Sequence, residues 1–179
     1  MNFIDQIISH YDLSPIITSL IVFLIFALIE IVIAIPESLY HHFILEERFG
    51  FNRLTVKLFW VDQLKGVIIS AIIGLPLIAA TIWIMTSLGG SWWIYAWALI
   101  TIFQLVTLWL YPLLIAPLFN RFSPLEEGEV KERVLSLLDR VGFNSRGLFV
   151  MDASKRTTHG NAYFTGPGKS KRIVLFDTL

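Results

Sequence analysis

The sequence contains no cysteine among its 179 residues and few charged residues. The absence of cysteine excludes disulfide bonds, a thiolate nucleophile and cysteine-ligated zinc. Charged residues make up 16% of the chain, against about 25% in soluble domains, which disfavours an ordinary soluble domain. The formal net charge is zero, which argues against binding of nucleic acid through bulk charge. No lysine or arginine precedes Arg48, so the N-terminus lacks the basic region of a secretory signal peptide.

The sequence is rich in long apolar runs that contain few charged residues. Hydrophobic residues make up 55% of the chain, and the mean hydropathy is +0.68. Three runs, at residues 15–36, 65–88 and 91–118, are each long enough to cross a bilayer, which takes about 20 helical residues. The sequence therefore predicts a multi-pass integral membrane protein in contact with lipid. Glu30 lies within the first run, where an acidic side chain either faces water or is protonated or paired at a helix contact.

The basic residues predict how the chain crosses the membrane. All fourteen lysines and arginines lie between the first two runs, as far as Lys65, or after the third run. Cytoplasmic loops carry an excess of Lys and Arg, so we expect a non-cytoplasmic N-terminus and a cytoplasmic C-terminal region. Residues 1–118 are thus predicted to form a membrane domain, and residues 119–179 a cytoplasmic lobe.

The C-terminal lobe is predicted to combine one helix with a β-hairpin. Ser123, followed by Pro124 and by Glu126, is typical of a capped helix start. The spacing of apolar residues extends this helix over residues 124–141. The predicted strands are short apolar runs at residues 147–152, 161–165 and 171–177. The fold class is therefore an α-helical membrane protein with three transmembrane helices and a small α+β lobe.

The stretch SKRTTHGNAYFTG, residues 154–166, is the main candidate for a functional element. Side chains alternate along a strand, which places Asn161 and Tyr163 on one face and Ala162 and Phe164 on the other. If one edge of this strand is unpaired, an extended peptide can add to it through backbone hydrogen bonds. The alternative is an ordinary hairpin in which Asn161 caps a turn.

Three blocks of sequence carry a family resemblance. They are HHFILEERFGFNRLTVKLFWVDQLKG at 41–66, IAPLFNRFSPLEEGEVK at 115–131, and DASKRTTHGNAYFTG with KSKRIVLFDTL at 152–166 and 169–179. In this order the blocks resemble the type-I CaaX prenyl proteases, which are integral-membrane zinc metalloendopeptidases. The resemblance implies hydrolysis of peptide bonds near the C-terminus of proteins, prenylated proteins included, by a zinc-bound water.

The resemblance also implies where substrate binds. The strand that flanks the family's zinc cleft corresponds to residues 161–164, and a loop leads into it. The predicted substrate-binding residues are Asn161, Ala162, Tyr163, Phe164 and His159. The expected partners are a peptide or lipidated protein and membrane lipid, and nucleic acid is not expected.

The zinc motif of that family is absent from this sequence. Its metal ligands come from an H-E-x-x-H helix and a later glutamate, and the glutamate within the motif is the general base. None of the four histidines here is followed by glutamate. We therefore expect no catalytic residue and no metal ligand in this chain, and zinc only in a longer protein with the motif beyond Leu179 and further helices upstream. The alternative is a non-catalytic membrane scaffold, or a degenerate relative, that binds peptide without metal.

Overall fold

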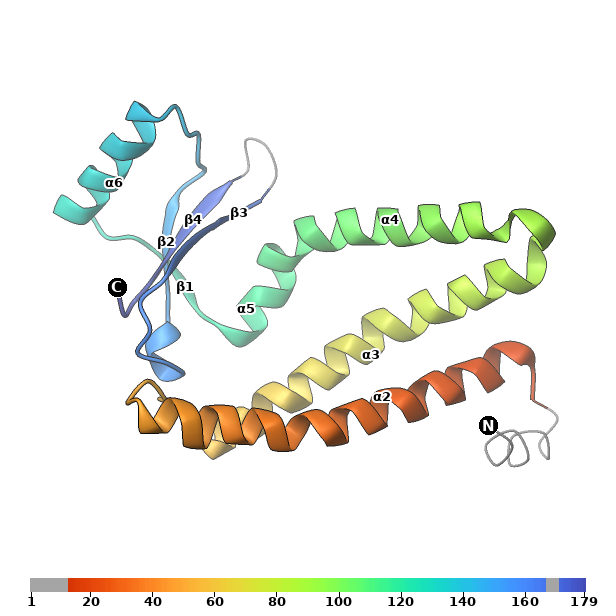
Figure 1. Ribbon diagram of the computed structural model, residues 1–179. Helices are drawn as coiled ribbons and strands as arrows, with labels where there is room; N and C mark the ends of the chain where they lie inside the picture. The colour runs from red at the N-terminus through yellow and green to blue at the C-terminus, as the bar shows by residue number, and fades with distance from the viewer. Residues whose placement is uncertain (1–12, 167–170) are drawn as a thin grey trace. The chain divides into compact units, whose positions relative to one another are not determined.

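The computed structural model describes residues 13–166 and 171–179 and is helical over its N-terminal part (Figure 1). The helical elements of this part are, in chain order, α2 (Pro15–Tyr40), η1 (His41–Glu46), α3 (Val56–Ser87), η2 (Gly89–Ser91), α4 (Trp92–Leu110), η3 (Tyr111–Ile115) and α5 (Ala116–Phe119). Of these, η1 and η3 are π-helical and η2 is a single 3-10 turn. The π-helical η3 contains Pro112, and proline interrupts the regular hydrogen bonding of a helix.

Among the described residues, three continuous helices are long and apolar enough to cross a membrane. They are Pro15–Glu46, Val56–Ser87 and Gly89–Phe119. The first predicted run ends at Pro36, whereas α2 continues through Pro36 to Tyr40, since membrane helices tolerate proline. The second helix begins well before Lys65. Its first turn is capped by Thr55, whose Oγ1 accepts a hydrogen bond from the Leu58 N–H at 3.2 Å.

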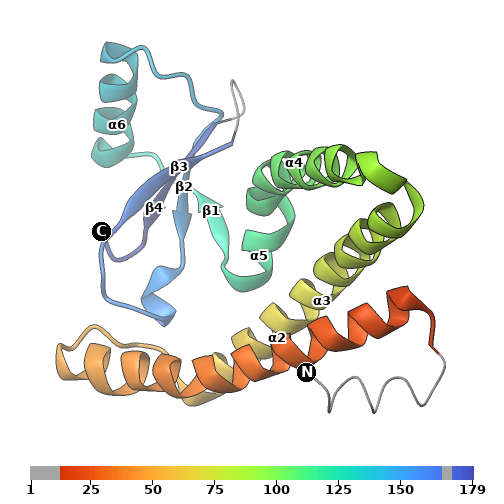
Figure 2. The same ribbon diagram turned by 45° about the vertical axis from the view of Figure 1, so that its right-hand side comes forward.

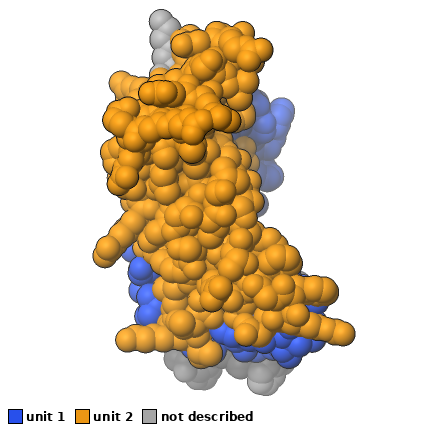
Figure 3. All heavy atoms as spheres, turned by 90° about the vertical axis from the view of Figure 1, so that its left-hand side faces the viewer, with its two compact units in different colours: residues 1–45, 60–103 blue, residues 46–59, 104–179 orange. Residues whose placement is uncertain are grey.

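The chain folds as two compact units (Figure 3). Unit 1 comprises residues 1–45 and 60–103, and unit 2 comprises residues 46–59 and 104–179. Within unit 1, an apolar hollow of about 620 Å³ lies between α2 and α3. Glu30 is exposed and lines this hollow, as does the half-buried Gln63, so Glu30 borders open space. That this space is wet in the membrane stays a prediction.

Unit 2 is built on a four-stranded sheet in the order β1-β2-β4-β3. Its strands are β1 (Phe122–Pro124), β2 (Leu148–Met151), β3 (Ala162–Thr165) and β4 (Arg172–Phe176). The β1–β2 and β3–β4 pairs are antiparallel, and the β2–β4 pair is parallel. The predicted hairpin is present as β3 and β4. It belongs to a larger sheet that includes β1, a strand that the sequence pattern did not predict.

The sheet lies between α6 (Glu129–Arg140) on one face and α5 on the other, as Figure 1 and Figure 2 both show. A buried cluster of Met151, Ala153 and Val174 forms the core of this unit. Half-buried aromatic side chains pack against it: Phe122, Phe149, Tyr163 and Phe176. These aromatic side chains belong to the α5 face, since Phe122 and Tyr163 line a narrow cavity together with Pro112 and Ala116.

The predicted start of the lobe helix at residue 124 is wrong. Residues Phe122–Pro124 form β1, and α6 begins at Glu129 without a side-chain cap. The cause is tertiary pairing, because the Leu125 N–H donates to the Leu148 carbonyl at 2.9 Å and Ser123 lies opposite Val150. Long-range strand pairing therefore overrides a local capping pattern.

Pro124 fits this strand for a geometric reason. The Leu125–Leu148 bond fixes which pairs of the β1–β2 ladder are hydrogen-bonded, and Pro124 falls between bonded pairs. A backbone N–H at this position would point away from β2 and find no acceptor there, so proline is tolerated.

The helix that follows, α6, ends at Arg140. Gly142 then adopts a φ of 64°, in the left-handed region expected after a helix.

Candidate functional site

The β3 strand is an edge of the sheet. In the described part of the chain it pairs with β4 alone. The Phe176 N–H donates to the Asn161 carbonyl at 2.9 Å, so Asn161 and Phe176 form a hydrogen-bonded pair. Bonded and non-bonded pairs alternate along an antiparallel ladder, and the backbone N–H and C=O groups of Ala162 and Phe164 therefore point away from β4. These groups form a free edge to which an extended chain can add.

Asn161 extends this free edge with its side chain. Its Oδ1 accepts a hydrogen bond from the Ala162 N–H at 2.8 Å, and the residue is exposed. One outward backbone donor is thereby satisfied within the strand, while the Asn161 amide nitrogen remains available as a donor. The free edge therefore offers two donors, the Phe164 N–H and the Asn161 amide nitrogen. It also offers two acceptors, the backbone carbonyls of Ala162 and Phe164.

The side chains of β3 divide between the two faces of the sheet as the alternation predicts. Tyr163 points to the core, where its hydroxyl donates to Met151 Sδ at 3.8 Å. Phe164 lies on the opposite face and is 65% exposed, with its ring 5.5 Å from that of Phe143. An apolar hollow of about 380 Å³ opens on this face, between α6 and β3, and Ala162 and Phe164 form part of its wall.

Tyr163 has a perturbed hydroxyl group. Burial is the main cause that raises its pKa above the ordinary value of 10.0. The neighbouring Tyr111 also raises the pKa, and the positive charge of Arg172 opposes them. The hydroxyl therefore stays protonated at neutral pH, as its role in the core requires.

The loop that leads into β3 is tied to the turn between η1 and α3. The Arg53 N–H donates to the Arg156 carbonyl and the Thr158 N–H donates to the Phe51 carbonyl, each at 3.0 Å. Asn52 and Thr157 form an antiparallel bridge between them. We refer to residues 46–54 as the connecting turn and to residues 156–160 as the entry loop.

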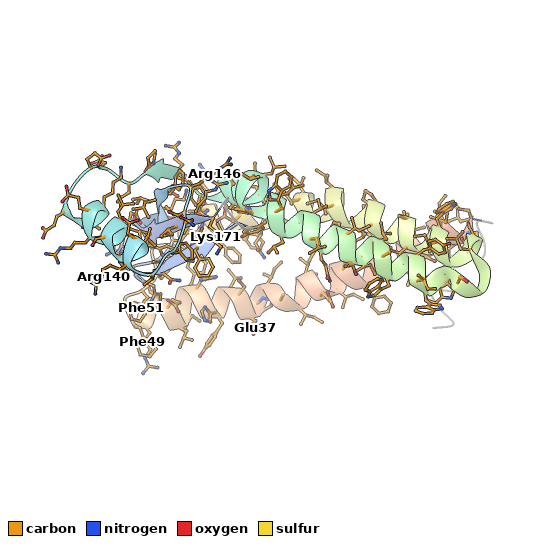
Figure 4. The ribbon with its side chains drawn as sticks, turned by 90° about the horizontal axis from the view of Figure 1, so that it is seen from above. Glu37, Phe49, Phe51, Arg140, Arg146 and Lys171 are labelled. Atoms are coloured by element: carbon orange, nitrogen blue, oxygen red, sulfur yellow. The ribbon has the colours of Figure 1, made fainter. Side chains whose placement is uncertain are left out.

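His159 adds a side-chain contact to this attachment. Its Nε2–H donates to Glu46 Oε2 at 3.0 Å. Its ring stacks on that of Phe51, with the centroids 4.0 Å apart and the planes inclined by 30°. Figure 4 shows Phe51 on the connecting turn, near Phe49. His159 therefore contacts the connecting turn, whereas Asn161, Ala162 and Phe164 lie together at the free edge.

Further polar groups hold the entry loop and Ser154, which precedes it. The Asp177 carboxylate accepts hydrogen bonds from the Ser154 N–H at 2.8 Å and from its Oγ at 2.5 Å. Thr178 Oγ1 donates to the His159 carbonyl at 2.7 Å. The Arg156 guanidinium donates at 2.8 Å to both Asn120 Oδ1 and the Phe119 carbonyl, so this basic residue holds the loop.

The sequence argument missed the supporting role of Glu46, Phe51 and Asp177. All three lie within the sequence blocks singled out above, and that is the only signal that points to them. Glu46 and His159 are 113 positions apart, so no local pattern relates them.

Comparison with known proteins places this arrangement in a family. The family model described as "CAAX prenyl protease N-terminal, five membrane helices" matches residues 1–121, and "Peptidase family M48" matches residues 124–179. The chain belongs to the CAAX prenyl protease family. The family is integral to membranes, in agreement with the three apolar helices of the described residues.

Individual members of the CAAX prenyl protease family are similar over most of this chain. The chain is 46% identical over 145 residues to the CAAX prenyl protease 1 homolog of Arabidopsis thaliana, covering 81% of this chain and 34% of the relative. It is also 46% identical over 146 residues to CAAX prenyl protease 1 of Saccharomyces cerevisiae, covering 81% and 32%. The crystal structure of S. mikatae Ste24p matches with a TM-score of 0.86 and 43% identity, over 93% of this chain and 39% of that chain. The chain thus spans about a third of the length of these curated relatives.

Members of the M48 part of the CAAX prenyl protease family are zinc metalloproteases. In the described part of this chain, no three His, Asp or Glu side chains lie close enough together to hold a metal ion. The pair of His159 and Glu46 supplies two such groups, and they bond to each other. Among the described residues, therefore, no group of side chains supplies the three protein ligands that a catalytic zinc site takes together with a water.

Proposed function

We propose that this chain is the N-terminal part of a membrane-embedded zinc metalloendopeptidase. The whole protein cleaves peptide bonds near the C-terminus of proteins, lipidated proteins included. This chain supplies membrane helices and the strand that pairs with substrate. The observation that carries the proposal is the unpaired edge of β3, with Asn161 exposed beside it, in a chain of the CAAX prenyl protease family.

In this proposal the substrate binds as an added antiparallel or parallel strand beside β3. The Phe164 N–H and the outward carbonyls of Ala162 and Phe164 bond to its backbone, each bond contributing about 1 kcal/mol. The Asn161 amide nitrogen donates to a substrate carbonyl. The hollow beside Phe164 is apolar and takes an apolar side chain of the peptide. Tyr163 contributes by anchoring the strand to the core.

The metal belongs to the remainder of the protein. A zinc ion bound there would supply an activated water for peptide hydrolysis. The residues of this chain bind and orient the peptide, and we assign them no metal ligation and no proton transfer. Zinc is thus expected in the full-length protein.

We also propose that the lobe formed by residues 119–179 is cytoplasmic and that the N-terminal end of α2 is non-cytoplasmic. The placement of every lysine and arginine after residue 47 but outside the link between α3 and α4 supports this orientation. The exposed apolar side chains along the helices, among them Val32, Ile33 and Leu108, support contact with lipid. Because the chain has no cysteine, a single introduced cysteine reports its own side of the membrane. With a membrane-impermeant maleimide on intact cells, Gly90→Cys should label, and Ser136→Cys on α6 should label only after permeabilisation.

The activity is tested by comparing the full-length gene product with this chain. The coding sequence beyond Leu179 should encode an H-E-x-x-H motif, and the purified full-length protein should bind one zinc per chain and cleave a peptide ending in a CaaX sequence. Removal of zinc with a chelator should abolish cleavage, and the 179-residue chain alone should neither bind stoichiometric zinc nor cleave. A stop codon after Leu179 would support the alternative, a non-catalytic scaffold that holds peptide at β3.

A further inference from the structure

We propose that Glu46, Phe51 and His159 form a clasp that positions the β3 edge for substrate. In this assignment His159 is a positioning residue that acts through the entry loop, and its side chain makes no contact with the peptide. The inference rests on the proposed function, because the edge it positions is the one that we propose to hold substrate.

The need for such a clasp follows from the sheet. β3 has ladder hydrogen bonds on one side only, to β4, so the N-terminal end of the strand depends on the chain that precedes it. That chain is the entry loop, which lacks a strand or helix of its own before Ala162. Two backbone hydrogen bonds and the bridge at Thr157 attach the loop to the connecting turn, and the His159 side chain is the last attachment to that turn before the edge.

The connecting turn provides a firm support for this attachment. The Glu46 carbonyl accepts hydrogen bonds from the Phe51 N–H at 2.9 Å and the Asn52 N–H at 3.3 Å. The Asn52 side chain closes the turn further, since its Oδ1 accepts from the Leu54 N–H at 2.8 Å. Glu46 and Phe51 are therefore held beside one another, so the carboxylate and the ring that hold His159 are fixed together.

The side chains of the clasp are also partly shielded from water. The Glu46 side chain is 22% exposed and the His159 side chain 49%, so their hydrogen bond is less screened than a bond on an open surface. Stacking on Phe51 limits the rotation of the imidazole ring. Two residues, Gly160 and Asn161, separate this fixed ring from the first strand residue, Ala162. The clasp consequently sets where Asn161 begins the edge.

The connecting turn joins α2 and η1 to α3, which are two of the candidate membrane spans. The clasp therefore links the cytoplasmic ends of these helices to the strand that we propose to hold substrate. A shift of the helix ends would displace the entry loop and change peptide affinity, without altering any group that takes part in bond cleavage. This predicts an effect on KM and little effect on kcat.

The test uses the full-length protein with Glu46→Ala, His159→Ala and the double variant. Each single change should raise KM for a CaaX-terminated peptide about tenfold with kcat within about twofold, and the double variant should be no worse than either single one, because coupled contacts are lost together. Hydrogen exchange of the amides of residues 161–165 should speed up in all three, while exchange in β2 and β4 stays unchanged. His159→Gln, which can still donate to Glu46, should restore most of the affinity. Glu37→Gln is the control, since it removes an exposed carboxylate from α2 away from the turn.

Several results would overturn the clasp. They are additive effects in the double variant, a fall in kcat at unchanged KM, or unchanged exchange at residues 161–165. If the wild-type protein does not cleave peptide, the proposed function fails, and the exchange measurement alone decides on the clasp. If the alanine variants do not fold, Phe51→Leu gives the same exchange readout, because it removes the stacked ring while keeping an apolar side chain.

Discussion

The two edges of the sheet differ in what they offer to another strand. On β1 the outward-facing backbone positions are Phe122 and Pro124, and on β3 they are Ala162 and Phe164. Pro124 has no N–H, and proline is a common means of blocking an edge against further pairing. On β3 the Asn161 side chain satisfies the Ala162 N–H but brings an amide donor of its own. The β1 edge therefore lacks an outward donor at Pro124. The β3 edge keeps the same number of donors, because the Asn161 amide takes the place of the Ala162 N–H.

The side chains of the two edges differ in the same sense. Phe122 packs against the buried cluster of Met151, Ala153 and Val174, so β1 serves the core. Phe164 is 65% exposed next to an apolar hollow, where it contributes little to the core. An exposed aromatic residue on a free edge carries a risk of aggregation. The comparison supports the proposal that β3 binds substrate, whereas β1 contributes to the core.

The largest effect is expected from Phe164→Pro in the full-length protein. The change removes the outward N–H of the edge and none of the bonds to β4, so β3 becomes like β1. We expect kcat/KM for a CaaX-terminated peptide to fall about 100-fold, since a hydrogen bond is lost and the proline ring obstructs the approaching strand. Phe164→Ala, which keeps the N–H, is the control. Equal losses in the two variants would show that the side chain and not the backbone edge binds substrate.

A smaller effect is expected from changes at Asn161. Asn161→Asp keeps an oxygen that can accept from the Ala162 N–H but has no amide donor, and Asn161→Ala loses both. If the donor holds substrate, both variants should lower kcat/KM by about tenfold, the effect of one hydrogen bond at the upper end of its usual range. Steady-state kinetics of the purified full-length proteins measures this. Wild-type activity in Asn161→Asp would mean that only the internal bond to Ala162 matters.

Pro124→Ala tests the other edge. The substitution gives β1 an outward N–H without changing its bonds to β2, because Pro124 lies between bonded pairs. Peptide cleavage should change by less than about twofold, within the range of an ordinary surface substitution. The same kinetic assay measures it. A loss comparable to that of the Asn161 variants would remove the distinction between the two edges.

The smallest effect is expected on the stability of the folded protein at high pH, through Tyr163 on the inward face of β3. Burial, with a further contribution from Tyr111, raises the pKa of the Tyr163 hydroxyl above 10.0. The folded state therefore holds this proton more tightly than the unfolded state, so the stability it provides is complete below pH 10.0 and is lost as the pH rises through the folded-state pKa. Tyr163→Phe should flatten the loss of stability above pH 10.0 in denaturant unfolding. An unchanged pH profile would show that Tyr163 titrates as it does in the unfolded chain.

Local pattern in the sequence was sufficient for some features of this fold and insufficient for others. The apolar runs and the alternation of Tyr163 with Phe164 depend on neighbours in the chain, and the structure has both. Ser123 carries a capping pattern that is correct in isolation, but pairing with Val150 places it in a strand instead. The free edge at β3 depends on the order of all four strands, which no single segment encodes.

The bond between Glu46 and His159 joins residues 113 positions apart, and the whole of α3 and α4 lies between them. Closing so long a segment of chain is entropically costly, and non-local contacts of this kind slow folding. During synthesis the two partners cannot meet until both intervening helices have left the ribosome and settled. The clasp that we propose therefore cannot position β3 in a nascent chain that is too short to contain both partners.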